Sequence, residues 1–169
     1  MNKEKDKILN QWFDLVMRSY PKDTAKFYMR EEDTFANPVG STIFQGLNAL
    51  LDELFGAMDH ETLKSSLDPI IRIRAVQGFS PSDAVAFIFS LKTIIRKNLA
   101  KEINNNPEVA TSLLAFETNI DRLGLIGFDI YNACKEKIHE LKVKEIRKTA
   151  FRRVNNTSLP AKSRVVPSR

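Results

Sequence analysis

Cysteine, histidine and tryptophan are scarce in this chain of 169 residues, which contains one Cys, two His and one Trp. The single cysteine, Cys134, cannot close an intramolecular disulfide and cannot form a multi-cysteine metal site. Neither histidine stands in a metal-ligand arrangement, since HETLK, which begins at His60, is not the HExxH motif, and His139 has charged neighbours. These shortages exclude the disulfide-rich secreted class and favour a protein of the reducing cytosol without a metal.

Long hydrophobic runs and the common catalytic motifs are also missing. No stretch of about 18 or more apolar residues occurs, and the N-terminus lacks the apolar segment of a signal peptide. We therefore expect a cytoplasmic protein without a membrane span. The nucleophile elbow GxSxG and the phosphate loops GxGxxG and GxxxxGK followed by Ser or Thr do not occur. We expect a protein that is not an enzyme and that holds no cofactor.

Charge is distributed unevenly along the chain, whose formal net charge is +5. Residues 135–169 contain eleven Lys or Arg and three Glu, a net charge of +8, whereas residues 1–134 have a net charge of −3. A basic end on a mildly acidic body favours an acidic partner, which can be nucleic acid, an anionic membrane or an acidic protein surface. The alternative is a basic end that only keeps the chain in solution.

The hydrophobic content of 43% is enough for the core of one domain, and its pattern is helical. From about Lys3 to Ser19, apolar residues recur at helical spacing, and Pro21 ends the pattern. A short helix capped by Asp23 follows. The face of the first helix consists of Ile8, Trp12, Leu15 and Val16.

The stretch FANPVGSTIFQG contains the start of a third helix. Asn37 is a favoured N-cap residue, and a residue before proline avoids the α region, as an N-cap should. Pro38 suits the first helical turn because its missing N–H is not needed there. Gly40 and Gly46 would permit close approach of a neighbour. An apolar face follows, made of Ile43, Phe44, Leu47, Leu50, Leu51 and Leu54.

More helices are expected between residues 59 and 99, and His60 should lie in the first turn of a helix after Asp59. Asp68 and Pro69 suggest a helix that ends at Gly78, although the alternation in IIRIRAV leaves a short strand as an alternative. Ser80 and Pro81 give a clearer start, with the spacing of a capping box to an acidic residue three positions later. The helix behind it should be largely buried, through Ala84, Phe87, Ile88, Leu91, Ile94 and Ile95.

A long helical pattern begins at Glu108, after a loop marked by NNNP, and continues to about Val154. Unbroken, it would measure about 70 Å, which is more than a compact domain of this size needs, so its end should project. We expect a homodimer through this helix, with the alternative that the same residues pack inside the monomer. The predicted dimer seam consists of Ile120, Leu123, Gly124, Gly127, Ile130 and Cys134.

Beyond residue 140 the apolar stripe changes face, and basic residues occupy the opposite side. Such an amphipathic helix is typical of a partner-binding segment. The predicted partner-binding residues are Val143, Ile146, Ala150 and Val154 on the apolar side and Lys144, Lys148 and Arg152 on the basic side. From Asn155 onward the sequence has no periodicity and should be disordered. The expected organisation is a helical domain over 1–150 and a basic tail over 151–169.

Three segments together resemble the RsbRD N-terminal domain family, which is related to RsbT co-antagonist proteins of bacterial stress signalling. They are Phe35 with NPVGSTI, then IRIRAVQGFSPSDAVAFIFSLKTIIRK, then FDIYNACKEKIHELKVKEIRK, and the resemblance covers about residues 8–150. Single residues that carry it, and for which we expect structural roles, are Phe35, Pro38, Ser80, Pro81, Phe87 and Tyr131.

The resemblance implies an all-α sensory or regulatory domain, similar to the haem-free globin-like input modules of stressosome proteins. These modules pair as dimers and pass signals along a C-terminal helix to a STAS domain, whereas no STAS domain follows residue 150 here. We expect a non-enzymatic signalling or adaptor protein with a protein partner, built as a globin-like or related multi-helix bundle with a long C-terminal helix. The alternatives are a nucleic-acid-binding protein that uses the basic helix and tail, and a haem or small-ligand sensor.

Overall fold

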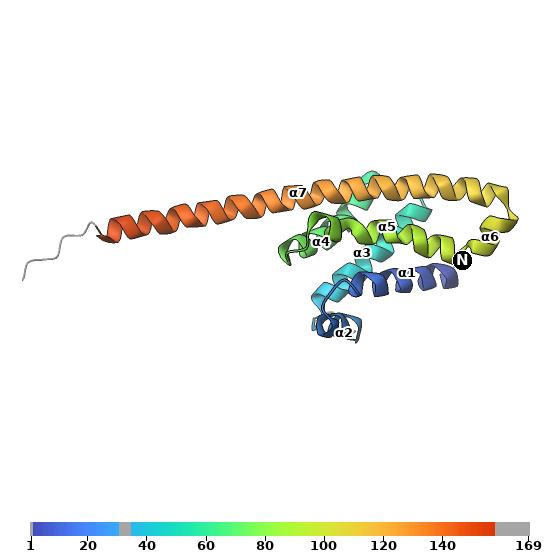
Figure 1. Ribbon diagram of the computed structural model, residues 1–169, viewed down its shortest axis with the longest axis horizontal. Coiled ribbons are helices and arrows are strands. Elements are labelled where there is room, and N and C mark those ends of the chain that lie inside the picture. The colour runs from blue at the N-terminus through green and yellow to red at the C-terminus, as the bar shows by residue number, and fades with distance from the viewer. Residues whose placement is uncertain (1, 31–34, 158–169) are drawn as a thin grey trace, which may run out of the picture. The chain divides into compact units, whose positions relative to one another are not determined.

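The computed structural model describes residues 2–30 and 35–157, and over these residues it is built of α-helices without a strand, as predicted (Figure 1). The chain divides after Cys134 into two units. We call the first the body (2–134) and the described part of the second the terminal segment (135–157). The helices are α1 (Asn2–Met17), α2 (Lys22–Arg30), α3 (Pro38–Phe55), α4 (His60–Val76), α5 (Pro81–Asn98), α6 (Ala100–Asn105) and α7 (Pro107–Thr157).

The core of the body forms where α3 packs against α4 and where α1 packs against both α3 and α5. Trp12 lies at its centre with no exposed surface, and its indole Nε1 donates a hydrogen bond to the carbonyl oxygen of Phe87 on α5 at 2.7 Å. The predicted faces of α1 and α5 are buried, except that Leu15 is 36% exposed. Leu15 therefore lies at the edge of the apolar stripe of α1.

The start of α3 has the predicted geometry. Asn37 is the N-cap, and its side-chain Oδ1 accepts a hydrogen bond from the Gly40 amide at 2.9 Å. The Asn37 Nδ2 group donates to the carbonyl oxygen of Tyr28 on α2 at 2.9 Å. A Cβ on Gly46 would lie 2.8 Å from the Cδ1 atom of Ile70 on α4, so this glycine does permit the close approach of the two helices. Asn37 therefore starts α3 and also ties it to α2.

The helix start predicted at Asp68 and Pro69 is wrong, whereas His60 does lie in a first helical turn after Asp59. The helix begins at His60 with Asp59 as its N-cap, and the Asp59 carboxylate accepts the Thr62 amide at 2.8 Å. Pro69 stands inside the helix, and Asp68 forms an ion pair with Arg72 one turn later instead of a cap. The alternative of a short strand in this segment is wrong as well. The helix ends at Val76, shortly before Gly78, whose φ of +85° suits glycine.

Ser80 caps α5 as predicted, since its Oγ accepts the Asp83 amide at 3.1 Å and its hydroxyl donates to the Asp83 carboxylate at 2.6 Å. Asp23, in contrast, is not a cap, because α2 begins one residue earlier at Lys22. The short helix α6 was not predicted. At the other end, α7 continues to Thr157, so Asn155 is helical rather than disordered, and the tail from residue 158 lies outside the described residues.

Candidate functional site

The terminal segment is a single stretch of helix, and its side chains up to Arg153 are exposed except for Ile138 and Val143, which are intermediate. Ile146 is 67% exposed. Within this unit no second element is described against which an apolar side chain could pack. An amphipathic helix normally gains stability by burying its apolar face, so an uncovered apolar stripe is the main candidate for a contact surface.

The predicted partner-binding residues do fall on opposite sides of this helix. At 100° per residue, Ile146 and Ala150 share a face, one turn apart, with Val143 beside them. Ile146 and Ala150 line a shallow groove on the helix surface, whose other lining residues are Lys142, Glu145, Thr149 and Arg153. Lys144, Lys148 and Arg152 follow one another at four-residue spacing on the other side. The backbone of Val154 continues the apolar side, and its side chain lies outside the described residues.

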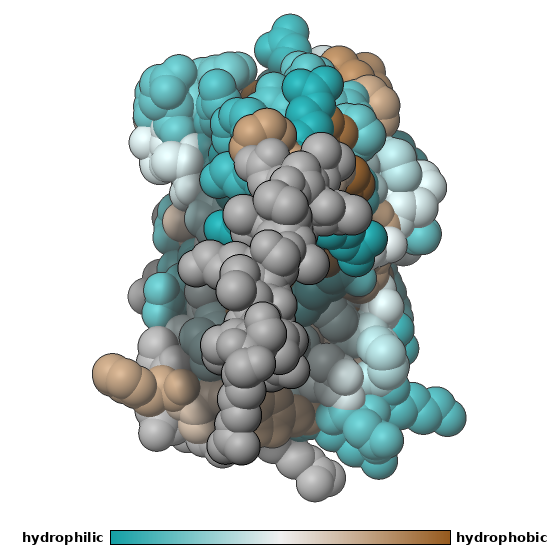
Figure 2. Space-filling model, turned by 90° about the vertical axis from the view of Figure 1, so that its left-hand side faces the viewer, coloured by the Kyte–Doolittle hydropathy of each residue, from teal (hydrophilic) through white to brown (hydrophobic). Residues whose placement is uncertain are grey.

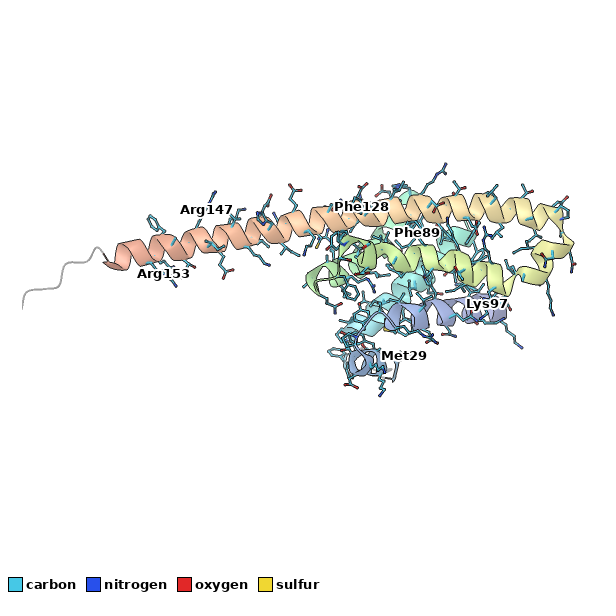
Figure 3. The ribbon with its side chains drawn as sticks, viewed as in Figure 1. Met29, Phe89, Lys97, Phe128, Arg147 and Arg153 are labelled. Carbon is cyan, nitrogen blue, oxygen red and sulfur yellow. The ribbon has the colours of Figure 1, made fainter. Side chains whose placement is uncertain are left out.

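Two exposed apolar residues of the terminal segment were not among the predicted site residues. Phe151 is 67% exposed, and because it follows Arg147 by four positions and Lys148 by three, it lies on the basic side. Leu141 is 55% exposed and lies about 140° around the helix from Ile146, on a different face. Neither belongs to the apolar stripe of Val143, Ile146 and Ala150, from which the site residues were predicted. In Figure 3 the labels of Arg147 and Arg153 mark the terminal segment.

The predicted dimer seam is wrong, because all six of its residues are buried within the body. The exposed fraction of Ile120 is 0%, that of Leu123 is 1%, and those of Ile130 and Cys134 are 5% each, while the two glycines are classed as buried. The alternative that these residues pack inside the monomer is the arrangement found. Residues already covered by their own chain cannot also face a second copy.

The two glycines of that seam receive side chains from α5. A Cβ on Gly124 would lie 2.2 Å from the Cζ atom of Phe89, so the phenyl ring rests directly on the α7 backbone. A Cβ on Gly127 would lie 2.9 Å from the Cδ1 atom of Ile88. The close approach expected of these glycines therefore exists, but between α7 and α5 of the same chain.

Polar contacts also join α7 to the rest of the body. Arg96 on α5 donates from Nε and Nη2 to the two carboxylate oxygens of Glu117, at 2.5 and 2.7 Å. Glu117 is only 6% exposed, and the hydrogen bonds from Arg96 hold its pKa below the ordinary value. The Tyr131 hydroxyl donates to the carbonyl oxygen of Phe79 at 2.6 Å. Tyr131 thus has the structural role expected of it.

Neither histidine is placed as a haem or metal ligand would be. His60 is exposed in the first turn of α4 and lines a surface depression with Lys64, Asp68 and Arg72, and His139 is exposed on the terminal segment. Among the described residues there is no group of three or more His, Cys, Asp or Glu side chains that could hold a metal ion. Cys134 is a free, buried thiol.

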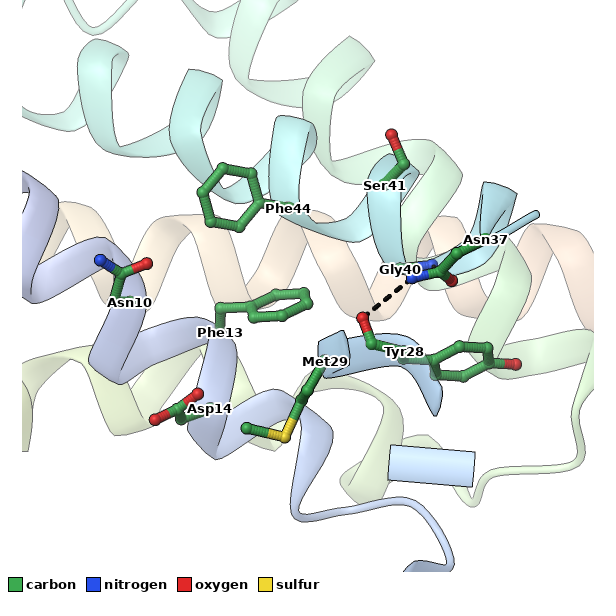
Figure 4. A pocket seen from close by; sticks show the side chains of 9 residues that line it. All are labelled: Asn10, Phe13, Asp14, Tyr28, Met29, Asn37, Gly40, Ser41 and Phe44. Atoms are coloured by element: carbon green, nitrogen blue, oxygen red, sulfur yellow. Dashed lines mark hydrogen bonds between the residues drawn. The ribbon is translucent and has the colours of Figure 1, made fainter. Parts of the chain in front are cut away.

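A cavity of about 460 Å³ lies where α1, α2 and α3 meet, at the site of the FANPVGSTIFQG stretch (Figure 4). Phe13 and Phe44 meet edge to face in its wall, with ring centroids 5.3 Å apart. Asn37 reaches it from the other side, with its amide bonded to Tyr28. Of the polar groups there, the Asn37 side chain and the Gly40 amide form the cap of α3. Phe35, the first residue of the stretch, is 96% exposed.

The described helices include none with both the length and the hydropathy that crossing a bilayer requires. On the face shown in Figure 2 the coloured surface is largely hydrophilic, with separate hydrophobic groups. A curated protein of Archaeoglobus fulgidus, described as an uncharacterized protein, is 25% identical over 145 residues, which is 84% of each chain. No solved structure matches the chain. The model of the RsbT co-antagonist protein rsbRD N-terminal domain matches residues 6–145, and the chain therefore belongs to that family.

Proposed function

We propose that this protein is a non-enzymatic signalling or adaptor module that binds a protein partner through the terminal segment. Its family suggests an input domain of the stressosome type, which acts by protein–protein contact. The observation that carries the proposal is the apolar stripe of exposed Ile146 and Ala150 and partly exposed Val143, which no other described element of its unit can cover. A helix of this kind binds by laying its apolar face into a groove on a partner.

The charges of the terminal segment indicate which charge the rim of the partner's groove should have. Residues 135–157 contain eight Lys or Arg and three Glu. Lys142 and Arg147 flank the apolar stripe on its two sides, at about 40° and 100° from Ile146. A groove with an apolar floor and acidic residues on both edges would match this pattern, and the opposite charges would also speed association.

The test compares two substitutions of the same chemistry on different faces of one helix. Ile146→Asp places a carboxylate in the stripe, whereas Leu141→Asp places one on another exposed position. Tagged variants are expressed in the native cells, and the partner captured by the wild type is identified by mass and then titrated as a purified protein. We expect Ile146→Asp to abolish binding and Leu141→Asp to retain it. Equal binding by both variants would refute the role of the stripe.

The same variants separate the adaptor from the nucleic-acid alternative. If Lys144, Arg147, Lys148, Arg152 and Arg153 contacted phosphates of duplex DNA, the slope of log K against log salt would approach about −4 to −5. We expect no such affinity at physiological salt. A measurable affinity that is lost in the triple variant Lys144→Gln, Lys148→Gln, Arg152→Gln and kept in Ile146→Asp would make the basic side the functional surface.

A homodimer remains part of the proposal, through a surface other than the buried seam. Leu125 and Phe128 on α7 are 67% and 44% exposed, and Phe89 of α5, whose ring rests on Gly124, is 40% exposed. Phe128 follows Gly124 by one helical turn and Leu125 by three residues, so both lie on the side of α7 that faces Phe89 or next to it. Phe89 and Phe128 are labelled in Figure 3. An apolar group of this kind at a helix pair suits a symmetric contact.

Light scattering tests the dimer independently of the partner. We expect a dimer at micromolar concentration that becomes a monomer on Leu125→Asp, with an unchanged circular dichroism spectrum. Leu114→Asp is the matched control, because Leu114 is an equally exposed leucine on the same helix. A wild-type monomer at high micromolar concentration would end this part of the proposal and leave the partner-binding part standing.

A further inference from the structure

Arg74 on α4 is a charged side chain inside the body, with only 1% of its surface exposed. Its Nη2 group donates to Ser19 Oγ and to the carbonyl oxygen of Asp83, each at 3.0 Å. Both acceptors are uncharged. Among the described residues no carboxylate lies within ion-pair distance of this guanidinium, and its Nε and Nη1 atoms are buried without a hydrogen-bond partner.

Aromatic rings surround this guanidinium. Its Cζ atom lies 4.1 Å from the ring centroid of Phe79 and 5.5 Å from those of Tyr20 and Phe87. Ring faces attract a cation, but they accept none of its N–H groups in the manner of an oxygen. Burial lowers the pKa of Arg74 and raises that of Tyr20, whose hydroxyl is also buried without a partner. A buried charge is normally paired, whereas the Asp83 carboxylate and the Tyr20 hydroxyl offset only part of the effect of burial on the pKa of Arg74, and Asp83 acts from beyond ion-pair distance.

A cavity of about 450 Å³ adjoins Arg74, and its size is that of a small-molecule site. Its walls combine apolar and polar groups. The apolar residues are Leu15, Val16, Phe79, Ala86 and Phe87, and the polar ones are Ser19, Asp83, Ser90 and Arg74 itself. The cavity therefore offers one cation and an apolar surface, while the hydroxyls of Ser19 and Ser90 already donate to the carbonyl oxygens of Val16 and Phe87. These are the features that recognise an anionic group attached to a short apolar chain.

We propose that this cavity binds a small aliphatic monocarboxylate, with its carboxylate on Arg74 and its chain against Leu15, Ala86 and Phe87. A guanidinium binds a carboxylate through charge-assisted hydrogen bonds, and the negative charge would compensate the buried cation. Asp83 lines the same cavity, and its negative charge favours one anionic charge over the two of a phosphate. The site involves the body alone and does not depend on the partner contact proposed above.

The chain provides its own reporter for a test. Trp12 is the only tryptophan, and its indole bonds to Phe87, which lines the cavity. Hexanoate is titrated into the full-length protein while the fluorescence of Trp12 and the melting temperature are followed. Controls at equal ionic strength are sodium chloride, inorganic phosphate and 1-hexanol, which has the same chain without the charge. We expect a saturable response to hexanoate and a weak one or none to the controls.

Two substitutions then locate the binding. Arg74→Met removes the charge at nearly constant volume and should weaken hexanoate binding at least about tenfold, since a hydrogen bond to a charged group is lost. Ala86→Phe fills the cavity from an exposed position and leaves Arg74 in place. If Arg74→Met does not fold, this variant still tests whether hexanoate binds in the cavity. It should abolish the response as well. Asp52→Asn, a surface change on α3, is the matched control and should bind as the wild type does.

Several results would overturn the proposal. Absence of a saturable response to hexanoate would do so, as would equal affinity for 1-hexanol, because the charge would then be irrelevant. Phosphate that binds more tightly than hexanoate would refute the assignment to a monocarboxylate. Unchanged hexanoate binding by both Arg74→Met and Ala86→Phe would place the ligand elsewhere.

Discussion

Replacing Asn37 tests whether one side chain both caps α3 and ties it to α2. In Asn37→Ala the Gly40 amide loses its acceptor and the Tyr28 carbonyl loses its donor. The lost N-cap costs about 1 kcal/mol, and the lost buried bond to Tyr28, with its acceptor left unsatisfied, costs about 1–2 kcal/mol more. The sum of about 2–3 kcal/mol should lower the melting temperature by roughly 4–12 °C.

Thermal and urea unfolding followed by circular dichroism measure this loss. Asn37→Ser can keep the cap but cannot reach Tyr28, so we expect it to lose about half as much as Asn37→Ala. Ser80→Ala removes an exposed N-cap that has no bond comparable to that from Asn37 to Tyr28, so it should cost about 1 kcal/mol. Equal losses for Asn37→Ala and Ser80→Ala would contradict the reasoning, because burial of Asn37 would then add nothing.

Three further predictions concern acid stability, α7 packing and haem. Arg96 holds the pKa of Glu117 below its ordinary value of about 4.5, so the ionised carboxylate stabilises the fold above that pH. This contribution is lost as the pH falls through the lower pKa of the folded state. Glu117→Gln should therefore flatten the acid side of a plot of melting temperature against pH. Gly127→Leu should destabilise the monomer by more than about 1–3 kcal/mol in urea unfolding, since even a Cβ meets Ile88 at 2.9 Å. The purified protein should show no Soret band, because His60 and His139 are both exposed, and a Soret band lost on substitution of either would refute this.

The parts of the fold that follow local rules could be predicted from the sequence. Asn37 and Ser80 were identified as N-caps because the cap, the following proline and the apolar periodicity all lie within a few residues. The start of α4 was misplaced because Asp68 and Pro69 have the same local signature. The real cap, Asp59, lies nine positions earlier, and Asp68 instead pairs with Arg72 within the helix. Nothing local distinguishes an acidic cap from an acidic member of an ion pair.

The misassigned dimer seam shows a different limit. An apolar stripe with small residues indicates that another helix packs closely there, but it does not indicate whether that helix belongs to the same chain. Phe89 and Ile88 of α5 approach the glycines of α7 from about 35 positions away in the sequence. Such a contact depends on the tertiary arrangement, which periodicity along one helix does not contain.

The segment IIRIRAV shows how much changes when the backbone is known. As a strand, its two arginines would lie on one face; in a helix, residues two positions apart point about 160° away from each other. Arg72 accordingly lies at the surface beside Asp68, and Arg74 is buried among aromatic rings. The sequence presents two equivalent arginines, and the helix makes one a surface partner and the other an unpaired charge in the core. Because burying that charge is costly without a counter-ion, the cavity beside Arg74 is where a ligand would contribute most to the stability of the body.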